Sequence, residues 1–143
     1  MKKTVVIIDG MGGGIGAQLI SKLREIIDGE TELIALGTNA VATERMIKAG
    51  AHRGASGENA MRVSVSQGDF ILGPIGIVIP NSLMGEITAA MVEAILACRG
   101  EKLLLPLQQD HFRLVGTESL PFTRIIDMAV ETLKERMNRA AAL

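Results

Sequence analysis

Residues 4–16 read TVVIIDGMGGGIG, a run of β-branched residues that leads directly into a glycine-rich turn. The unbroken apolar run Thr4–Ile8 predicts a strand that is buried on both faces, as in a parallel sheet. From Ile15 to Asp28 the apolar residues recur at helical spacing, which predicts an amphipathic helix that Gly29 is suited to end. The stretch therefore predicts a strand, a tight turn and a helix in succession.

The glycines of this turn predict a site for a phosphate-bearing ligand, a nucleotide such as NAD(P). A tight turn needs backbone conformations that other residues resist, and a phosphate reaches the backbone only where no Cβ intrudes. The amino end of the following helix supplies free N–H groups and the positive end of its dipole. The spacing Gly12-x-Gly14-x-x-Ala17 matches the dinucleotide-binding pattern with alanine in third place. The alternative is a turn whose glycines serve only the packing of helix on strand.

Outward from this turn, strands and helices alternate along the chain. Further strands are predicted at 32–36, 69–72 and 102–107, with a short one at 113–115. Helices are predicted at 40–49, 82–99 and 121–142, with a short one near Ser56. The alternation predicts an α/β fold in one domain spanning residues 1–143. We expect a doubly wound, mostly parallel sheet of four to five strands with helices on both faces, which is a Rossmann-like architecture.

Composition agrees with one globular domain and excludes several classes of protein. The 143 residues are 48% hydrophobic and 22% charged, and with only 2% aromatic residues the core must be aliphatic. A net charge of −1 argues against a nucleic-acid-binding surface. Cys98 is the only cysteine, which excludes a disulfide framework and a cysteine-based zinc cluster, and we assign no metal. No stretch is long enough to span a bilayer, and Thr4–Ile8 is too short for a signal peptide, so we expect a cytoplasmic protein.

The spacing Gly10-x-x-x-Gly14-x-Gly16, with isoleucine between the last two glycines, resembles the turn of short-chain dehydrogenases. Their oxidoreductase chemistry does not carry over, because the catalytic tyrosine of that family is absent from this chain. The acid that ordinarily ends the second strand and binds a ribose is also missing, since Gly37–Asn39 stands in its place. An acid before Gly-x-Gly also resembles the first motif of class I methyltransferases, which leaves S-adenosylmethionine as an alternative ligand.

Four segments carry a resemblance that covers nearly the whole chain. They read IDGMGGGIG at 8–16, ALGTNA at 35–40, GAHRGASGENA at 50–60 and GPIG at 73–76. On these segments the chain resembles a family of short bacterial Rossmann-like proteins of unknown function. The resemblance implies the fold and an NAD(P)-type pocket but no activity and no catalytic residues. Whether the protein is an enzyme therefore stays open.

Ligands of open α/β sheets bind beyond the carboxyl ends of the strands, so the candidate site residues are those that follow predicted strands. The cofactor-binding residues that we predict are Asp9, Gly10, Gly12, Gly13, Gly14, Ile15, Gly16, Thr38, Asn39, Gly73 and Pro74. Asp9 also admits a structural interpretation, in which its carboxylate accepts hydrogen bonds from its own turn. Gln108, Gln109, Asp110 and His111 follow the fourth long strand and are expected at the same edge.

Other polar residues are weighed between a ligand and a structural role. Arg53 is a candidate anion clamp. Glu58 is expected in the first turn of a short helix rather than as a general base. Asn81-Ser82, with Glu86 behind it, is expected to cap the helix predicted at 82–99.

The segment Ile75–Ile79 is apolar and flanked by prolines, which suits a lid over a ligand, a subunit contact or packing in the core. We expect a homo-oligomer, with a homodimer as its simplest form. The alternative function is therefore a non-enzymatic regulatory or scaffold subunit that associates around this segment. No membrane or nucleic-acid partner is expected.

Overall fold

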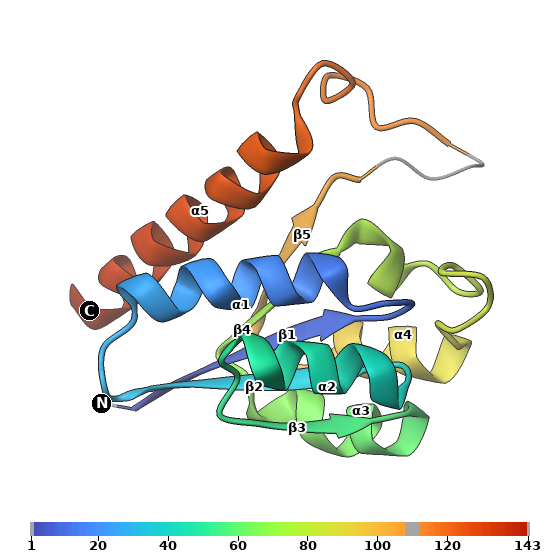
Figure 1. Ribbon diagram of the computed structural model, residues 1–143, viewed down its shortest axis with the longest axis horizontal. Helices are drawn as coiled ribbons and strands as arrows, with labels where there is room; N and C mark the ends of the chain where they lie inside the picture. Colours follow the sequence, from blue (N-terminus) through green and yellow to red (C-terminus); the bar gives the residue numbers. More distant parts are fainter. Residues whose placement is uncertain (1, 108–111, 143) are drawn as a thin grey trace.

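The computed structural model describes residues 2–107 and 112–142, and its centre is a five-stranded, entirely parallel sheet (Figure 1). The strands lie in the order β3-β2-β1-β4-β5. Their bounds are Lys3–Asp9 for β1, Thr31–Gly37 for β2, Arg53–Ser56 for β3, Phe70–Pro74 for β4 and Glu101–Leu105 for β5. The first strand is central, and it is buried on both faces, as its unbroken apolar sequence predicted. The predicted α/β, Rossmann-like fold class is confirmed.

Helices cover both faces of this sheet (Figure 1). Their bounds are Gly14–Ile26 for α1, Ala40–Ala49 for α2, Glu58–Ser64 for α3, Ala89–Ala97 for α4 and Phe122–Ala142 for α5, with 3-10 helices η1 at Val65–Gln67 and η2 at Ile75–Val78. Side chains of α1, α2 and α5 pack on one face of the sheet. Side chains of α3, α4 and η2 pack on the other. The sheet is therefore the middle of three layers.

The alternation of side chains along β1 divides the core into two clusters. Val5 and Ile7 are buried with Leu19, Leu23 and Leu133 on the face of α1 and α5. Neighbouring residues of the same strand point to the opposite face, because successive side chains of a strand alternate. They are buried there with side chains from α3 and α4, namely Val6 and Ile8 with Met61, Met91 and Ile95. Burial on both faces explains why β1 has no polar alternation.

Three predicted elements differ from the structure. The helix predicted at 82–99 begins only at Ala89, because Thr88 rather than Asn81-Ser82 caps it. Residues 79–88 instead form a loop in which Asn81, Leu83 and Met84 have positive φ angles of 68°, 55° and 56°. The strand predicted at 113–115 is not formed, whereas β3 lies in a stretch for which no strand was predicted.

The apolar segment Ile75–Ile79 packs in the core and is not an exposed patch. It forms η2, and Ile77 is completely buried against the cluster on the α4 face. Of the three roles expected for this segment, the structure shows core packing, in the form of a 3-10 helix.

Candidate functional site

The carboxyl ends of β1, β2 and β4 lie side by side and define the edge at which open α/β sheets bind ligands. The glycine-rich turn leaves β1 here, Thr38 and Asn39 follow β2, and η2 with the loop 79–88 follows β4. The connections from β1 and β4 lead to helices on opposite faces of the sheet, so the switch point of the topology lies between these two strands. The structure therefore brings together the three segments that the sequence predicted.

Asp9 is buried at the base of the turn and accepts hydrogen bonds from it. Its Oδ1 accepts from the Gly10 amide at 2.8 Å, and its Oδ2 accepts from the Gly16 amide at 2.7 Å. Burial raises the pKa of Asp9, against the lowering effect of the amides of Gly16, Gly10 and Ile15. The structural interpretation of Asp9 is confirmed. Direct contact between Asp9 and a ligand stays a prediction.

Glu86 of the loop 79–88 lies over the turn and meets three donors with one oxygen. Its Oε1 accepts from the Met11 amide at 2.8 Å and from Asn39 Nδ2 at 2.9 Å, and it also accepts from the Thr38 hydroxyl. Burial raises the pKa of Glu86, but the hydrogen bonds from Thr38, Met11 and Asn39 outweigh burial, so the pKa lies below its ordinary value. The predicted capping role of Glu86 is wrong: its carboxylate is an ionised partner of the turn.

Three glycines of the turn are required by packing. A Cβ at Gly10 would lie 2.6 Å from Thr38 Oγ1 and 2.9 Å from Glu86 Oε1. At Gly13, whose φ is +75°, a Cβ would lie 2.8 Å from the backbone of Ala42 in α2. At Gly16 it would overlap the Met46 sulfur. For these positions the protein itself explains the absence of a side chain.

Gly12 and Gly14 differ, because packing does not require them. The nearest atom to a Cβ at Gly12 would be Arg45 Nη1 at 3.8 Å, and at Gly14 the same nitrogen would lie at 3.5 Å. Both are ordinary contact distances, and neither glycine has a positive φ. Arg45 is exposed on α2, and its guanidinium donates to the Gly12 carbonyl at 3.3 Å. A bare stretch of backbone therefore faces an exposed cation.

Asn39, Gly73 and Pro74 lie at this edge in structural roles. The Asn39 side chain caps α2 by accepting from the Ala42 amide at 2.8 Å, while its Nδ2 donates to the Met11 carbonyl at 3.0 Å. Gly73 and Pro74 are buried at the end of β4, and a Cβ at Gly73 would lie 2.5 Å from the Ile8 carbonyl oxygen. Gln108, Gln109, Asp110 and His111 lie outside the described residues.

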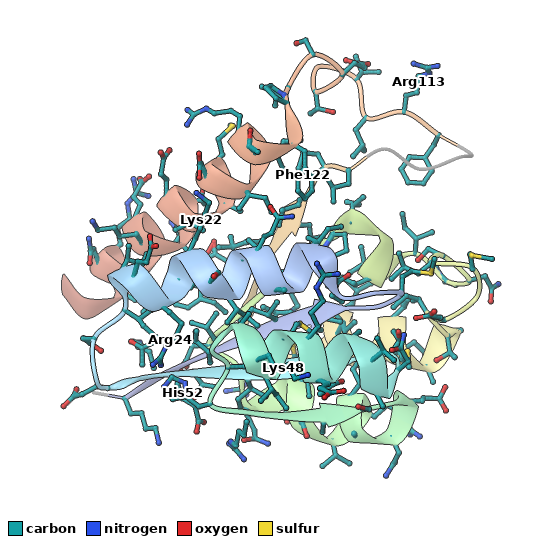
Figure 2. All side chains as sticks on the ribbon, viewed as in Figure 1. Lys22, Arg24, Lys48, His52, Arg113 and Phe122 are labelled. Carbon is teal, nitrogen blue, oxygen red and sulfur yellow. The ribbon has the colours of Figure 1, made fainter. Side chains whose placement is uncertain are left out.

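Arg53 does not reach the site. It begins β3, at the opposite end of that strand from the carboxyl edge, and its guanidinium pairs with Glu32 at 3.1 Å and donates to Gln67 at 2.7 Å. The role of Arg53 as an anion clamp is therefore wrong. His52 lies at the same end of the sheet, next to Arg24 (Figure 2). Glu58 begins α3, as predicted, and accepts from the Thr88 hydroxyl at 2.6 Å.

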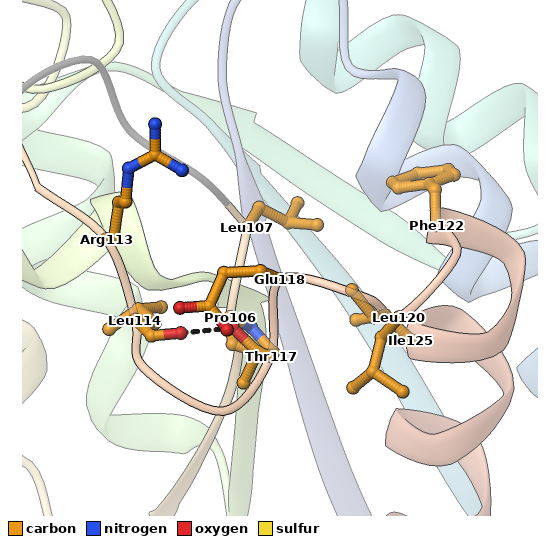
Figure 3. A pocket seen from close by; sticks show the side chains of 9 residues that line it. All are labelled: Pro106, Leu107, Arg113, Leu114, Thr117, Glu118, Leu120, Phe122 and Ile125. Carbon is orange, nitrogen blue, oxygen red and sulfur yellow. Dashed lines mark hydrogen bonds between the residues drawn. The ribbon is translucent and has the colours of Figure 1, made fainter.

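A small cavity lies beyond the carboxyl end of β5 (Figure 3). Pro106 and Leu107 line one side, while Arg113, Leu114 and Phe122 are among the residues that line the rest. Its volume is about 140 Å³. Sites for cofactor-sized ligands have roughly 300–1,000 Å³. This cavity is therefore too small for a nucleotide.

From the sequence, Glu86 received only a capping role and Arg45 none, because an arginine at a helical position on α2 carries no functional signal of its own. Among the residues that the structure describes, no group of three or more His, Cys, Asp or Glu side chains is arranged to bind a metal. None of the described helices has the length and apolar character needed to cross a bilayer.

Three solved structures are similar to this chain at low sequence identity. Saccharopine dehydrogenase (L-Glu forming) from Saccharomyces cerevisiae is 14% identical over 76% of this chain and 22% of that chain, with a TM-score of 0.49. An imine reductase from Myxococcus stipitatus, in complex with NAD+, is 19% identical over 73% of this chain and 33% of that chain, with a TM-score of 0.43. A dodecameric FMN-dependent Ubix-like decarboxylase from Escherichia coli O157:H7 is 15% identical over 95% of this chain and 94% of that chain, with a TM-score of 0.47. The chain thus spans less than two thirds of the length of the first two of these proteins.

No curated protein matches the sequence. One family does match, over residues 4–138, and it is described as a domain of unknown function. The match covers almost the whole length, including four strands of the sheet in full and β1 from its second residue. It agrees with the family of unknown function expected from the sequence, whose bacterial distribution stays a prediction. The chain therefore belongs to the family of the domain of unknown function DUF3842.

Proposed function

We propose that this protein binds a nucleotide such as NAD(P), with the ligand's phosphates against the backbone of Gly12 and Gly14. The observation that carries the proposal is the contrast among the glycines. Gly10, Gly13 and Gly16 lack a side chain because the fold leaves no room for one, whereas Gly12 and Gly14 have room and no unusual backbone angle. An approaching phosphate would give these two positions a reason to be bare.

Charge at the turn supports an anionic ligand at this place. Arg45 lies beside Gly12 and Gly14, and the amino end of α1 adds the positive end of its dipole. No described residue accepts a hydrogen bond from the amides of Gly12 and Gly14. The amides of Gly10 and Gly16 are already paired with Asp9. The proposed phosphate contacts therefore involve only Gly12 and Gly14, which are fewer residues than the whole turn that the sequence predicted.

The two carboxylates at the turn limit where the phosphates go. Asp9 is buried at the base of the turn, and its two carboxylate oxygens accept from the amides of Gly10 and Gly16 rather than from those of Gly12 and Gly14. Glu86 pairs with the Met11 amide, next to the first glycine of the turn. A phosphate close to Glu86 would be repelled. The geometry thus favours the Arg45 side of the turn, and it assigns no reaction and no catalytic residue.

The proposal is tested by separating binding from folding. Isothermal titration of the wild-type chain with NAD+, NADP+ and ATP should show binding of at least one of these phosphate-bearing nucleotides, and titration with S-adenosylmethionine, which has no phosphate, tests the alternative ligand. Gly12→Ala and Gly14→Ala each place a methyl group in the proposed phosphate path, and each should weaken binding by about tenfold or more. Since alanine is favoured over glycine in a helix by about 0.5–1 kcal/mol, the melting temperature of Gly14→Ala should not fall.

Two control variants frame this test. Gly29→Ala adds the same methyl group in open space outside the site, and it should change neither binding nor folding. Gly16→Ala drives a methyl group into Met46 and should lower the melting temperature instead. Unchanged affinity in both Gly12→Ala and Gly14→Ala would remove the turn from the proposal. Absence of binding of NAD+, NADP+ and ATP to the wild-type chain would overturn it, whether or not S-adenosylmethionine binds.

A further inference from the structure

We infer that Glu86 is the acceptor for the ribose hydroxyls of the bound nucleotide and that it selects NAD-type ligands over those with a 2′-phosphate. The inference rests on the proposed function, and it assigns a specificity-determining residue to that site. It starts from an acidic residue that is absent from the expected position in the sequence. Dinucleotide-binding sheets end their second strand with an acid that binds the ribose 2′-hydroxyl, and this chain has Thr38-Asn39 there instead.

In the structure, a carboxylate from another part of the chain lies beside the end of β2, where that acid is absent. Glu86 is separated from Thr38 by 48 residues and from Asn39 by 47, yet its Oε1 accepts a hydrogen bond from both side chains. The same oxygen would lie 2.9 Å from a Cβ at Gly10, the first glycine of the turn. The missing acid of β2 is thus replaced in space by an acid from the loop after β4.

One oxygen of the Glu86 carboxylate, Oε2, is available to accept hydrogen bonds from a ligand. Oε1 accepts from Thr38, Met11 and Asn39, whereas no described residue donates to Oε2. Glu86 is half-buried, and its three donors keep it ionised at neutral pH. An ionised carboxylate only accepts hydrogen bonds. A vicinal diol donates two, whereas a 2′-phosphate donates none and carries like charge.

The loop fixes Glu86 in this position. The Asn81 amide donates to the Ile87 carbonyl at 2.7 Å, and the Ile87 amide donates to the Ser82 carbonyl at 3.2 Å, which closes the loop on itself. The Leu83 side chain lies over Gly10, where a Cβ would approach its Cδ1 to 3.0 Å. Contacts within the loop and between the loop and the turn therefore hold the Glu86 side chain in a fixed position.

The test compares ligands that differ only at the ribose. Isothermal titration of the wild-type chain should show NAD+ binding tighter than NADP+ by about tenfold or more, and ADP tighter than 2′-deoxy-ADP. In Glu86→Gln the side chain keeps its shape and its acceptor oxygen but loses its charge. The preference for NAD+ over NADP+ should then shrink to within about threefold. Glu93→Gln, the same change on the exposed side of α4, should leave the preference intact.

Three other results would contradict either this inference or the proposed function. Equal affinity of the wild-type chain for NAD+ and NADP+ would overturn the inference without any variant, and the proposed function would survive. Equal tightening of both ligands in Glu86→Gln would also overturn it, since Glu86 would then only compete with the ligand. Absence of binding of every nucleotide would instead overturn the proposed function itself.

Discussion

At the scale of single residues, Glu86 makes a measurable link between protonation and folding. Its pKa in the folded protein lies below its ordinary value of 4.5, so ionised Glu86 stabilises the fold at pH above 4.5. That contribution should be lost as the pH falls through the folded-state pKa. Urea unfolding of the wild-type chain and Glu86→Gln should show the wild-type chain more stable at about pH 7 and the difference shrinking towards about pH 3.

Comparison with the variant is needed because Asp9 acts in the opposite direction. Burial raises the pKa of Asp9, so its contribution favours the folded state at low pH and is lost as the pH rises through its folded-state pKa. Asp9 is present in both proteins, so subtraction removes the part of its contribution that comes from burial and from its own turn, while the part that comes from the charge of Glu86 stays in the difference. A stability difference that stays constant between about pH 3 and 7 would contradict the role given to Glu86.

The sequence predicted one of these carboxylates and not the other. Asp9 sits beside its partners Gly10 and Gly16, and short polar side chains commonly bond their own turn, so its structural role was readable. Glu86 bonds an amide 75 residues earlier, and no local pattern encodes such a contact. The residues around it also mimic a helix start, which led to the incorrect capping role.

At the scale of elements, α5 is the helix whose docking can be tested most directly. Leu133 is completely buried between α5 and the sheet, in the same cluster as Val5 and Ile7. Leu133→Ala should lower the free energy of unfolding by about 2–5 kcal/mol, because it removes apolar contacts and leaves a cavity. Chemical denaturation followed by circular dichroism measures this loss.

The control for α5 is the same change at an exposed leucine. Leu96 of α4 is 56% exposed, and Leu96→Ala should change the free energy of unfolding by less than about 0.5 kcal/mol. A loss below about 1 kcal/mol for Leu133→Ala would mean that α5 is not packed as described.

Elements with a strong hydrophobic period were predicted well, and those shaped by backbone geometry were not. The helix α2 was predicted with its observed bounds, and α1 and α5 differ only at their ends. The start of α4 was placed too early because the positive φ angles of Leu83 and Met84 have no sequence signal. The strand β3 is four residues long and mostly exposed, so it lacks the apolar run that identifies a strand.

At the scale of the whole molecule, β5 forms one edge of the sheet. Within the described residues it pairs with β4 alone. The Glu101 amide donates to Asp69 on the β4 side, so the amides of Lys102 and Leu104 point outwards. A cavity of about 300 Å³, lined mainly by apolar residues of β5 and α5, lies beside this edge. An open edge strand is a template for pairing with another chain.

The sequence predicts a homo-oligomer that associates around Ile75–Ile79, but the structure packs that segment in the core. We propose this open edge as the contact instead. Light scattering should give a mass near twice 15.2 kDa. Lys102→Pro removes one outward amide and should return the chain to a monomer, whereas Lys102→Ala keeps that amide and should not. A mass of 15.2 kDa at every concentration would contradict self-association.

The architecture was readable from the sequence because few topologies fit alternating strands and helices. The turn and the segments after β2 and β4 were correctly placed at one edge of the sheet. The contacts that the loop 79–88 makes with the turn could not be predicted from the sequence, because they depend on Leu83 and Glu86 lying against residues far away in the chain.

The bond between the Met11 amide and Glu86 also gives the protein a built-in reporter. The Met11 side chain is 43% exposed, so its neighbourhood is open to solvent, yet its amide proton is shielded by a carboxylate from a distant loop. Deuterium can replace that proton only when the loop lifts. The exchange rate at this one amide, read by nuclear magnetic resonance, would therefore time the opening of the loop in the unliganded protein.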